Sequence, residues 1–246
     1  MARAAGSSAR CPPHSALAHL YSIGMTGPAI PKAVLFDLLT ALLDSASLWN
    51  AVAGSDEKGR AWRAEYLRLT YGCGAYRPYE QLVREAADAT AIEDSATEAL
   101  VSRWGELSPW SGAQTLLDKL QDVTKLAVVT NCSERLGVLA ASRLGTRWDC
   151  IVTAERAGYY KPHPRPYLLA LETLGASARD AVFVAGSGYD LIGTSGLGVR
   201  TYWHNRYGLQ RPAGAPSPDC EWSTLDHVLP WLKDLAGSVA DDPTRT

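Results

Sequence analysis

The stretch that decides the fold comes early in the chain and reads Ala33-Val34-Leu35-Phe36-Asp37. Four consecutive apolar residues indicate a buried β-strand, and the acidic residue stands directly at its end. In open α/β sheets the ligand site lies beyond the carboxyl ends of the strands. The residue that follows each apolar run is therefore the first place to look for functional side chains, and Asp37 is the first candidate.

Comparable apolar runs recur in the C-terminal half of the chain and alternate with segments of helical spacing. The expected strands are residues 126–129, 150–152, 181–184 and 199–203, and the expected helices are residues 112–121, 133–144, 166–174 and 191–197. Strands that alternate with helices predict a parallel sheet covered by helices on both faces. We therefore expect an α/β fold with a Rossmann-like core.

The block between the first strand and Pro109 has a different character. Helical spacing covers residues 46–70 and 79–104, a Gly-rich break separates these two parts, and no segment is convincing as a strand. This block is predicted to be a helical cap inserted over the edge of the sheet. The expected organisation is a core of residues 31–45 and 108–235, a cap of residues 46–107, an extension of residues 1–30 and a tail of residues 236–246.

The first 36 residues contain no Asp or Glu and are rich in Ala, Ser and Pro. Such a composition is typical of an organelle-targeting peptide. Pro12 and Pro13 interrupt any amphipathic helix, which favours a disordered extension instead. A further alternative is that Met25, rather than Met1, is the true initiator.

Bulk composition restricts the class of protein. A net charge of −2 over 246 residues offers no basic face for nucleic acid or for an anionic membrane, and no apolar run is long enough to span a bilayer. Five cysteines, an odd number without a CxxC pair, favour reduced thiols over a disulfide framework or a zinc site. We expect a cytoplasmic protein that acts on a small molecule.

Polar residues follow the predicted strands at four places. They are Asp37, the pair Thr130-Asn131, Lys161 and Asp190. A carboxylate can act as a nucleophile and form a covalent ester, and a nearby lysine keeps that carboxylate ionised. A hydroxyl and an amide can hold the attacking oxygen or the leaving group, and a second carboxylate can orient or deprotonate water. Gathered at one edge of a sheet, these groups form a catalytic set.

The segments around these residues resemble the four signature motifs of the haloacid dehalogenase superfamily. They read FDLLTAL at 36–42, VTNCS at 129–133, KPHPRPY at 161–167 and AGSGYD at 185–190. Their order, their strand contexts and the helical insertion after the first motif agree with that superfamily over residues 31–235. The resemblance implies a hydrolase whose nucleophile is Asp37, built on an α/β core with a helical cap.

Within the superfamily the sequence is more similar to the 2-haloacid dehalogenases than to the phosphatases. Most phosphatases carry an Asp two positions after the nucleophile and an acidic residue four positions before the last Asp, but here these positions hold Leu39 and Gly186. The dehalogenases need no metal, so no cofactor is expected. If Mg²⁺ were bound, its ligands would be Asp37, Asp190 and the Leu39 carbonyl.

Two other functions stay open. One is a Mg²⁺-dependent phosphatase or phosphonatase that acts on a small metabolite. The other is a non-enzymatic binding module built on a decayed site, although the presence of all four strand-end groups weighs against it.

The resemblance also implies catalytic roles. Asp37 attacks C2 of a small 2-haloacid and displaces the halide, which Asn131 helps to accept. Thr130 and Lys161 hold the nucleophile and the substrate carboxylate, and Asp190 orients Lys161 and the water that hydrolyses the ester.

Further residues are expected to bind the substrate. They are Leu38, Leu39, Arg63, Tyr79, Tyr167, Ser187 and Tyr189. Arg63 stands in a cap segment that resembles the one whose Arg captures the halide, although an Arg on a Trp-rich helix is equally often solvated or stacked on an aromatic ring. Homodimers are common among the dehalogenases, so a homodimer is possible.

Four positions depart from the dehalogenase pattern. Ala41, Ala185 and Ser187 stand where the dehalogenases carry Thr, Ser and Asn, and Thr40 comes one position early. Leu39 stands where Tyr is common in the dehalogenases. We expect these changes to remove polar contacts around the nucleophile and the hydrolytic water, which leaves the substrate open.

Overall fold

The computed structural model describes residues 30–240, with side chains described up to residue 235. Its core is a parallel six-stranded sheet in the order β5-β4-β1-β6-β7-β8. The strands are β1 (Ala33–Phe36), β4 (Lys125–Thr130), β5 (Cys150–Thr153), β6 (Ala181–Ala185), β7 (Arg200–His204) and β8 (Cys220–Trp222). β1 lies between β4 and β6, and all four of its residues are buried, as expected for a strand covered on both faces.

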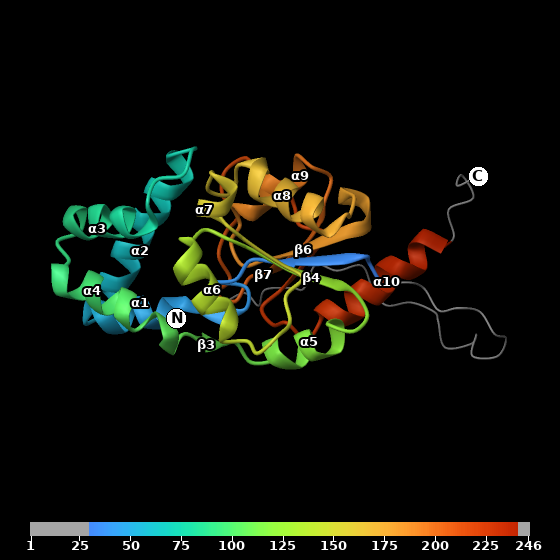
Figure 1. The fold of residues 1–246 in the computed structure, drawn as a ribbon, viewed down its shortest axis with the longest axis horizontal. Coiled ribbons are helices and arrows are strands. Elements are labelled where there is room, and N and C mark those ends of the chain that lie inside the picture. Colours follow the sequence, from blue (N-terminus) through green and yellow to red (C-terminus); the bar gives the residue numbers. More distant parts are fainter. Residues whose placement is uncertain (1–29, 241–246) are drawn as a thin grey trace, which may run out of the picture.

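Helices cover both faces of the sheet (Figure 1). The helices of one face are α7 (Ala154–Ala157), α8 (Pro164–Leu174) and α9 (Asp190–Ser195), and those of the other are α5 (Ala113–Leu120), α6 (Glu134–Ser142) and α10 (Val228–Ala240). Side chains alternate along β1, so Leu35 packs in the apolar cluster that contains residues of α8, whereas Val34 and Phe36 pack in the cluster that contains residues of α5 and α6. The predicted α/β fold is confirmed.

Four further helices are inserted between two short strands. These cap helices are α1 (Ser45–Ala53), α2 (Asp56–Gly72), α3 (Tyr79–Ala89) and α4 (Asp94–Ser102), followed by the 3₁₀ turn η1 (Trp104–Glu106). The flanking strands β2 (Leu43–Asp44) and β3 (Ser108–Pro109) pair antiparallel, so the chain leaves and re-enters the core at one place. Trp49 and Trp62 pack edge-on at 4.5 Å between ring centroids inside this insertion.

The insertion has a second attachment to the core, through the Gly-rich segment after α2. The Tyr76 backbone donates to the Gly158 carbonyl at 2.8 Å, and the Tyr160 backbone donates to the Gly74 carbonyl at 3.3 Å. Tyr76 and Tyr160 also stack, with ring centroids 5.4 Å apart. The cap helices are thus fastened to the residues that directly precede Lys161.

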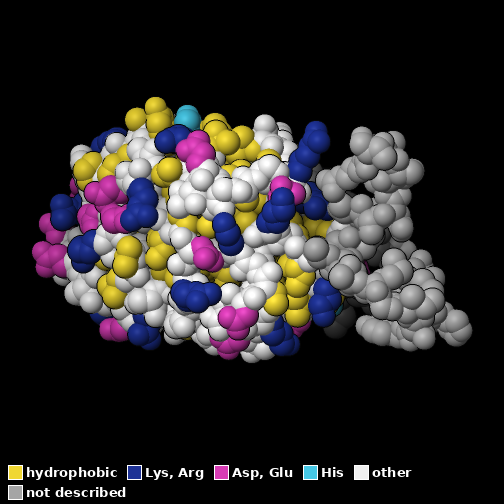
Figure 2. Space-filling view, turned by 45° about the vertical axis from the view of Figure 1, so that its right-hand side comes forward, with side chains coloured by type: hydrophobic (Ala, Val, Ile, Leu, Met, Phe, Trp, Pro, Cys, Tyr) yellow, Lys and Arg dark blue, Asp and Glu magenta, His cyan; other side chains and the backbone are white. Residues whose placement is uncertain are grey.

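The surface carries both signs of charge. Basic and acidic side chains are interspersed on the face shown in Figure 2, in keeping with the net charge of −2. Cys73, Cys132 and Cys150 are free thiols, as expected, whereas Cys220 is disulfide-bonded, which corrects the expectation of a reduced thiol at that residue. Within residues 30–240, no helix combines the length and the apolar character needed to cross a bilayer.

The ends of the chain differ in part from expectation. The predicted extension lies outside the described residues but for residue 30. At the other end, α10 continues to Ala240 and so includes the first five residues of the expected tail. Val228 and Leu232 anchor this helix in the core, and extending an existing helix is far easier than nucleating one. The edge strand β8 was not predicted, because its sequence Cys220-Glu221-Trp222 is too short to show a pattern.

Candidate active site

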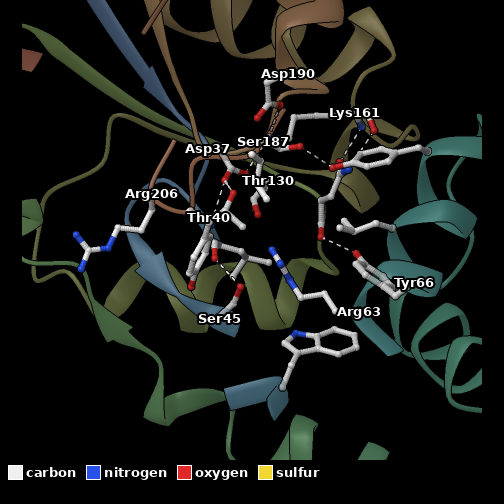
Figure 3. A pocket seen from close by; sticks show the side chains of 18 of the residues that line it. Asp37, Thr40, Ser45, Arg63, Tyr66, Thr130, Lys161, Ser187, Asp190 and Arg206 are labelled. Atoms are coloured by element: carbon white, nitrogen blue, oxygen red, sulfur yellow. Dashed lines mark hydrogen bonds and ion pairs between the residues drawn. The ribbon is translucent and has the colours of Figure 1, made fainter. Parts of the chain in front are cut away.

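The strand order brings the predicted polar residues to one edge of the sheet. Asp37 follows β1, Thr130 ends β4, and Asp190 begins α9 just after β6. Because β4, β1 and β6 are neighbours and parallel, their carboxyl ends lie side by side. Lys161, in the loop between α7 and α8, completes the group, which Figure 3 shows around a common cavity.

Asp37 is held by donors on both carboxylate oxygens. Oδ1 accepts from Lys161 Nζ at 2.8 Å. Oδ2 accepts from Thr40 Oγ1 at 2.5 Å, from the Thr40 backbone at 3.0 Å and from the Ala41 backbone at 3.2 Å. Burial alone would raise the pKa of Asp37, but the Lys161 charge and these hydrogen bonds outweigh burial and lower the pKa below its ordinary value. Asp37 is therefore ionised at neutral pH.

Thr40 corrects one of the expectations from sequence. Ala41 was expected to leave the nucleophile short of a hydroxyl contact. The hydroxyl of Thr40, one position earlier, makes that contact instead, because the backbone turns immediately after β1 and brings Thr40 back over Asp37.

Lys161 is an ammonium shared by two buried carboxylates. Its Nζ lies 2.8 Å from Asp37 Oδ1 and 2.9 Å from Asp190 Oδ1. Burial opposes its charge, but the charges of Asp190 and Asp37 prevail and raise the pKa of Lys161. For Asp190, burial together with the Asp37 charge outweighs Lys161 and raises the pKa. The three groups therefore carry one net negative charge when both acids are ionised.

Asp190 has one oxygen committed and one available. Its Oδ1 contacts Lys161 and accepts from the Tyr167 hydroxyl at 2.8 Å. Its Oδ2 is buried and has no hydrogen-bond partner among the described residues. Because a buried carboxylate oxygen is unfavourable without a donor, Oδ2 is suited to accept a proton donor that enters the cavity.

Asn131 clamps the backbone of Lys161. Its Nδ2 donates to the Lys161 carbonyl at 3.1 Å, and its Oδ1 accepts from the Lys161 amide at 2.7 Å. The Asn131 carbonyl in turn accepts from the Tyr66 hydroxyl of α2 at 3.2 Å. The Asn131 amide thus positions Lys161 and retains one N–H for a ligand.

The cavity has a volume of about 110 Å³ and lies between the strand ends and the cap helices. Nine of the residues predicted from sequence line it: Asp37, Leu39, Arg63, Tyr79, Thr130, Asn131, Lys161, Ser187 and Asp190. Arg63 points into it (Figure 3) and has no ion pair with an acid in the described part of the chain. The hydroxyls of Thr130 and Tyr79 are buried without a partner among residues 30–240.

Three residues predicted to bind substrate do not line the cavity. Leu38 is fully buried in the apolar core, because successive residues after a strand point to opposite sides. Tyr167 lies behind Asp190 and acts on it by its hydrogen bond. Tyr189 is 39% exposed and stacks on Tyr71, with ring centroids 4.0 Å apart.

Several lining residues were missed by the analysis of sequence. They are Thr40, Ser45, Trp49, Tyr66, Leu67, Tyr71, Gly186, Arg206, Tyr207 and Leu209. Two signals could have found some of them. Tyr66 and Leu67 stand three and four residues after Arg63 and so share its face of α2. Arg206 stands just after β7, and the ligand site of an open α/β sheet lies beyond the carboxyl ends of its strands.

The residues present do not fit a magnesium ion. The Lys161 ammonium already contacts one carboxylate oxygen each of Asp37 and Asp190, and the Leu39 carbonyl accepts from Ser45 Oγ at 2.6 Å. Gly186 offers no carboxylate, and any side chain there would overlap Thr40 Oγ1 and the Ala41 backbone. Mg²⁺ requires a near-octahedral set of oxygen ligands, which these groups do not supply. Within residues 30–240, no three His, Cys, Asp or Glu side chains are grouped to hold a metal.

The sequence profile of haloacid dehalogenase-like hydrolases matches residues 34–204, a range that contains all four strand-end segments. The chain belongs to this family. It is therefore a hydrolase of the haloacid dehalogenase superfamily, as the motifs predicted.

Some individual relatives are named as dehalogenases and others as phosphatases. (S)-2-haloacid dehalogenase 4A of Burkholderia cepacia is 28% identical over 231 residues, which cover 87% of this chain and 97% of the relative. A phosphoglycolate phosphatase of Xylella fastidiosa (strain 9a5c) is 32% identical over 220 residues, which cover 84% of this chain and 88% of the relative. A crystal structure of a dehalogenase with an intermediate complex superposes with a TM-score of 0.73 at 26% identity, covering 85% of this chain and 99% of that one.

Proposed function

We propose that this hydrolase cleaves the carbon–halogen bond of a small 2-haloacid through an ester on Asp37, without a metal. The observation that carries the proposal is the pairing of an ionised, buried Asp37 with Lys161, in a cavity lined by Arg63, whose guanidinium has no ion pair within the described residues. Displacement at carbon needs an ionised nucleophile and a cationic acceptor for the departing anion, and Asp37 and Arg63 supply these two groups.

The first step forms the ester. Asp37 Oδ2 accepts three hydrogen bonds and Oδ1 accepts one, so Oδ1 is the oxygen with a lone pair free to attack. A bond forms between Oδ1 and C2 of the substrate, and the C2–halogen bond breaks with its electron pair going to the halide. Arg63 receives the halide, and the unpartnered Thr130 hydroxyl donates to the substrate carboxylate.

The second step regenerates the enzyme. Water attacks the Asp37 carboxyl carbon, and the bond between that carbon and the ester oxygen, the former Oδ1, breaks. The 2-hydroxyacid leaves with this oxygen on C2. Asp190 Oδ2 accepts one proton of the water and passes it to the departing oxygen, and the second proton leaves the Asp37 carboxyl group for solvent. The raised pKa of Asp190 suits this transfer, because a raised pKa makes a carboxylate a stronger base.

The size of the cavity restricts the substrate. A space of about 110 Å³ admits an acid of a few carbon atoms and leaves no room for a nucleotide or a sugar phosphate while the cap helices are in place. The proposal is therefore a short 2-haloacid.

The phosphatase alternative is kept because a phosphoglycolate phosphatase is 32% identical to the chain. The two functions separate in one assay that measures halide release from 2-haloacids and phosphate release from phosphoesters, each with and without EDTA. We expect halide release that EDTA leaves unchanged. Phosphate release that EDTA abolishes, with no halide from any haloacid, would favour the alternative and refute the proposal.

The nucleophile is tested by a single turnover in H₂¹⁸O with the haloacid that gives activity. We expect the label first in the Asp37 carboxylate, as seen by mass spectrometry of the peptide that contains it. Asp37→Asn keeps the size of the side chain and removes the charge, so it should abolish halide release. Label that enters the product directly in the first turnover would contradict an ester on Asp37.

The remaining properties belong to the same proposal. We propose that the enzyme needs no cofactor, works in the cytoplasm and forms a homodimer. Three of the four cysteines within the described residues are free thiols, which supports a reducing compartment, while the disulfide of Cys220 weighs against it. The dimer is suggested by the dehalogenases that the chain resembles. Sedimentation of the full chain and imaging of a tagged chain test these two points.

A further inference from the structure

Among the cap residues that line the cavity, Tyr71 is the one whose hydroxyl contacts the loop before Asp190. Tyr71 stands in the last turn of α2, and its hydroxyl lies 3.0 Å from Ser187 Oγ of the loop between β6 and α9. Both residues line the cavity together with Asp37 and Asp190. This contact joins the cap to the same loop that positions Asp190.

The Tyr71 ring is fixed in place. It stacks on Tyr189 with ring centroids 4.0 Å apart and planes inclined by 24°. Because a tyrosine side chain has only two rotatable bonds, this stack and the contact with Ser187 determine where its hydroxyl points. The hydroxyl is therefore a fixed group of the site.

The Tyr71–Ser187 pair retains one free O–H. Ser187 Oγ accepts from the Tyr189 backbone at 3.3 Å, and only one proton is needed for the bond between the two hydroxyls. Burial, with the Asp190 charge next in effect, raises the pKa of Tyr71, so the phenol stays protonated at neutral pH. Whichever hydroxyl donates to the other, the second O–H is left for a group in the cavity.

Asp190 provides the complementary acceptor. Its Oδ2 is buried and lacks a partner among the described residues. A water molecule that donates one proton to this oxygen and accepts the free O–H of the pair keeps a lone pair for the Asp37 carboxyl carbon. Asp190, Tyr71 and Ser187 all line the cavity, so one water molecule there has a donor and an acceptor among its walls.

We propose that Tyr71 is a water-positioning residue, which acts with Ser187 to orient the water that hydrolyses the ester on Asp37. This inference rests on the proposed function, since it assigns a residue to its second step. The water oxygen forms a bond to the Asp37 carboxyl carbon and gives its proton to Asp190, while the Tyr71–Ser187 pair fixes the direction of attack. Tyr71 takes no part in the first step, because halide leaves from C2 and not from the Asp37 carbon.

The test separates the two steps of the reaction with Tyr71→Phe, which keeps the stacked ring and removes the hydroxyl. Rapid quench measures halide release in the first turnover, steady-state assay measures overall turnover, and intact-protein mass spectrometry measures the esterified enzyme. We expect first-turnover halide release within about twofold of wild type, and turnover lower by about 10- to 100-fold because one hydrogen bond in the transition state is lost. The ester should accumulate. Ser187→Ala should show the same pattern.

Tyr76→Phe is the matched control, because this variant also loses a hydroxyl from the cap segment but its ring stacks on Tyr160 outside the cavity. It should behave like wild type in all three assays. The inference is overturned if Tyr71→Phe slows halide release and turnover equally, or if it changes neither. Failure of the proposed function looks different, since the wild-type enzyme would then release no halide at all.

Discussion

Removing the ammonium between the two buried acids should destabilise the protein in a way that depends steeply on pH. Lys161→Met keeps the length of the side chain and deletes the charge. Nζ lies 2.8 Å from Asp37 Oδ1 and 2.9 Å from Asp190 Oδ1, and each contact is worth about 6 kcal/mol at an effective dielectric constant of about 20. Asp37 and Asp190 would otherwise face each other without a counter-charge.

The variant can avoid this repulsion at a lower cost in free energy, because one of the two carboxylates can take up a proton. At pH 7 this costs about 4 kcal/mol for an acid whose ordinary pKa is 3.8. The other acid, Asp37, keeps its donors from Thr40 and Ala41. We therefore expect Lys161→Met to lose about 4 kcal/mol of unfolding free energy at pH 7, which lies within the range for breaking a buried ion pair.

The sign of the pH dependence follows from the same proton. In the variant the folded-state pKa of that acid is raised above its unfolded value. The contribution of this acid to the unfolding free energy is therefore present at low pH and is lost as pH rises. The loss should shrink by about 1.4 kcal/mol per pH unit, from about 4.4 kcal/mol at pH 7 to about 1.6 kcal/mol at pH 5. In the wild type the effect is smaller, because the pKa of Asp37 is lowered and that of Asp190 is raised, which gives opposite slopes.

The assay is urea unfolding followed by tryptophan fluorescence at pH 5 and pH 7. Lys32→Met is the matched control, since Lys32 forms an exposed ion pair with Asp180 and its loss should change stability little at either pH. A loss for Lys161→Met that is equal at both pH values, or no loss at all, would refute the assignment of Lys161 as the counter-charge of Asp37 and Asp190.

Three further predictions concern residues around Asp37, Lys161 and Asp190. Thr40→Val should lower turnover about 10-fold by removing a hydrogen bond to Asp37, while Thr40→Ser keeps it; equal kinetics of the two variants would contradict this role. Gly186→Ala should lower the unfolding free energy by about 1–3 kcal/mol, since the new methyl group overlaps Thr40. Gly72→Ala meets open space and should not lower it. Equal melting temperatures of the two variants would contradict the close approach of Gly186 to Thr40. Asn131→Leu should lower kcat by freeing the backbone of Lys161, and unchanged kinetics would show that Lys161 holds its position without the clamp.

The sheet and the core half of the site were predictable because they depend on local sequence and a simple topological rule. An apolar run such as residues 33–36 identifies a buried strand, and parallel pairing places the ends of neighbouring strands together. Asp37, Thr130 and Asp190 follow directly from that rule. Lys161 was found by its motif, although a loop and a short helix separate it from its strand.

The cap half of the site was harder to predict, because its residues reach the cavity through the orientation of whole helices. Tyr71 lies in the cavity only because the segment after α2 is fastened to residues 158–160. No periodicity in the sequence of α2 shows that its last turn meets the loop of Ser187. Tyr189, which directly precedes Asp190, was expected to bind substrate and instead stacks on Tyr71.

The sequence by itself determined that Asp37 ends a buried strand of a parallel sheet and meets the other strand-end groups. The tertiary structure decided how that carboxylate is held, with Lys161 shared between Asp37 and Asp190 and with Thr40 taking the contact that Ala41 lacks. The physical reason is a difference in range. Strand burial and pairing are set by hydrophobic pattern over a few residues, whereas hydrogen-bond partners, charges and pKa shifts in a site depend on atoms that only the packed chain brings within 3 Å of one another.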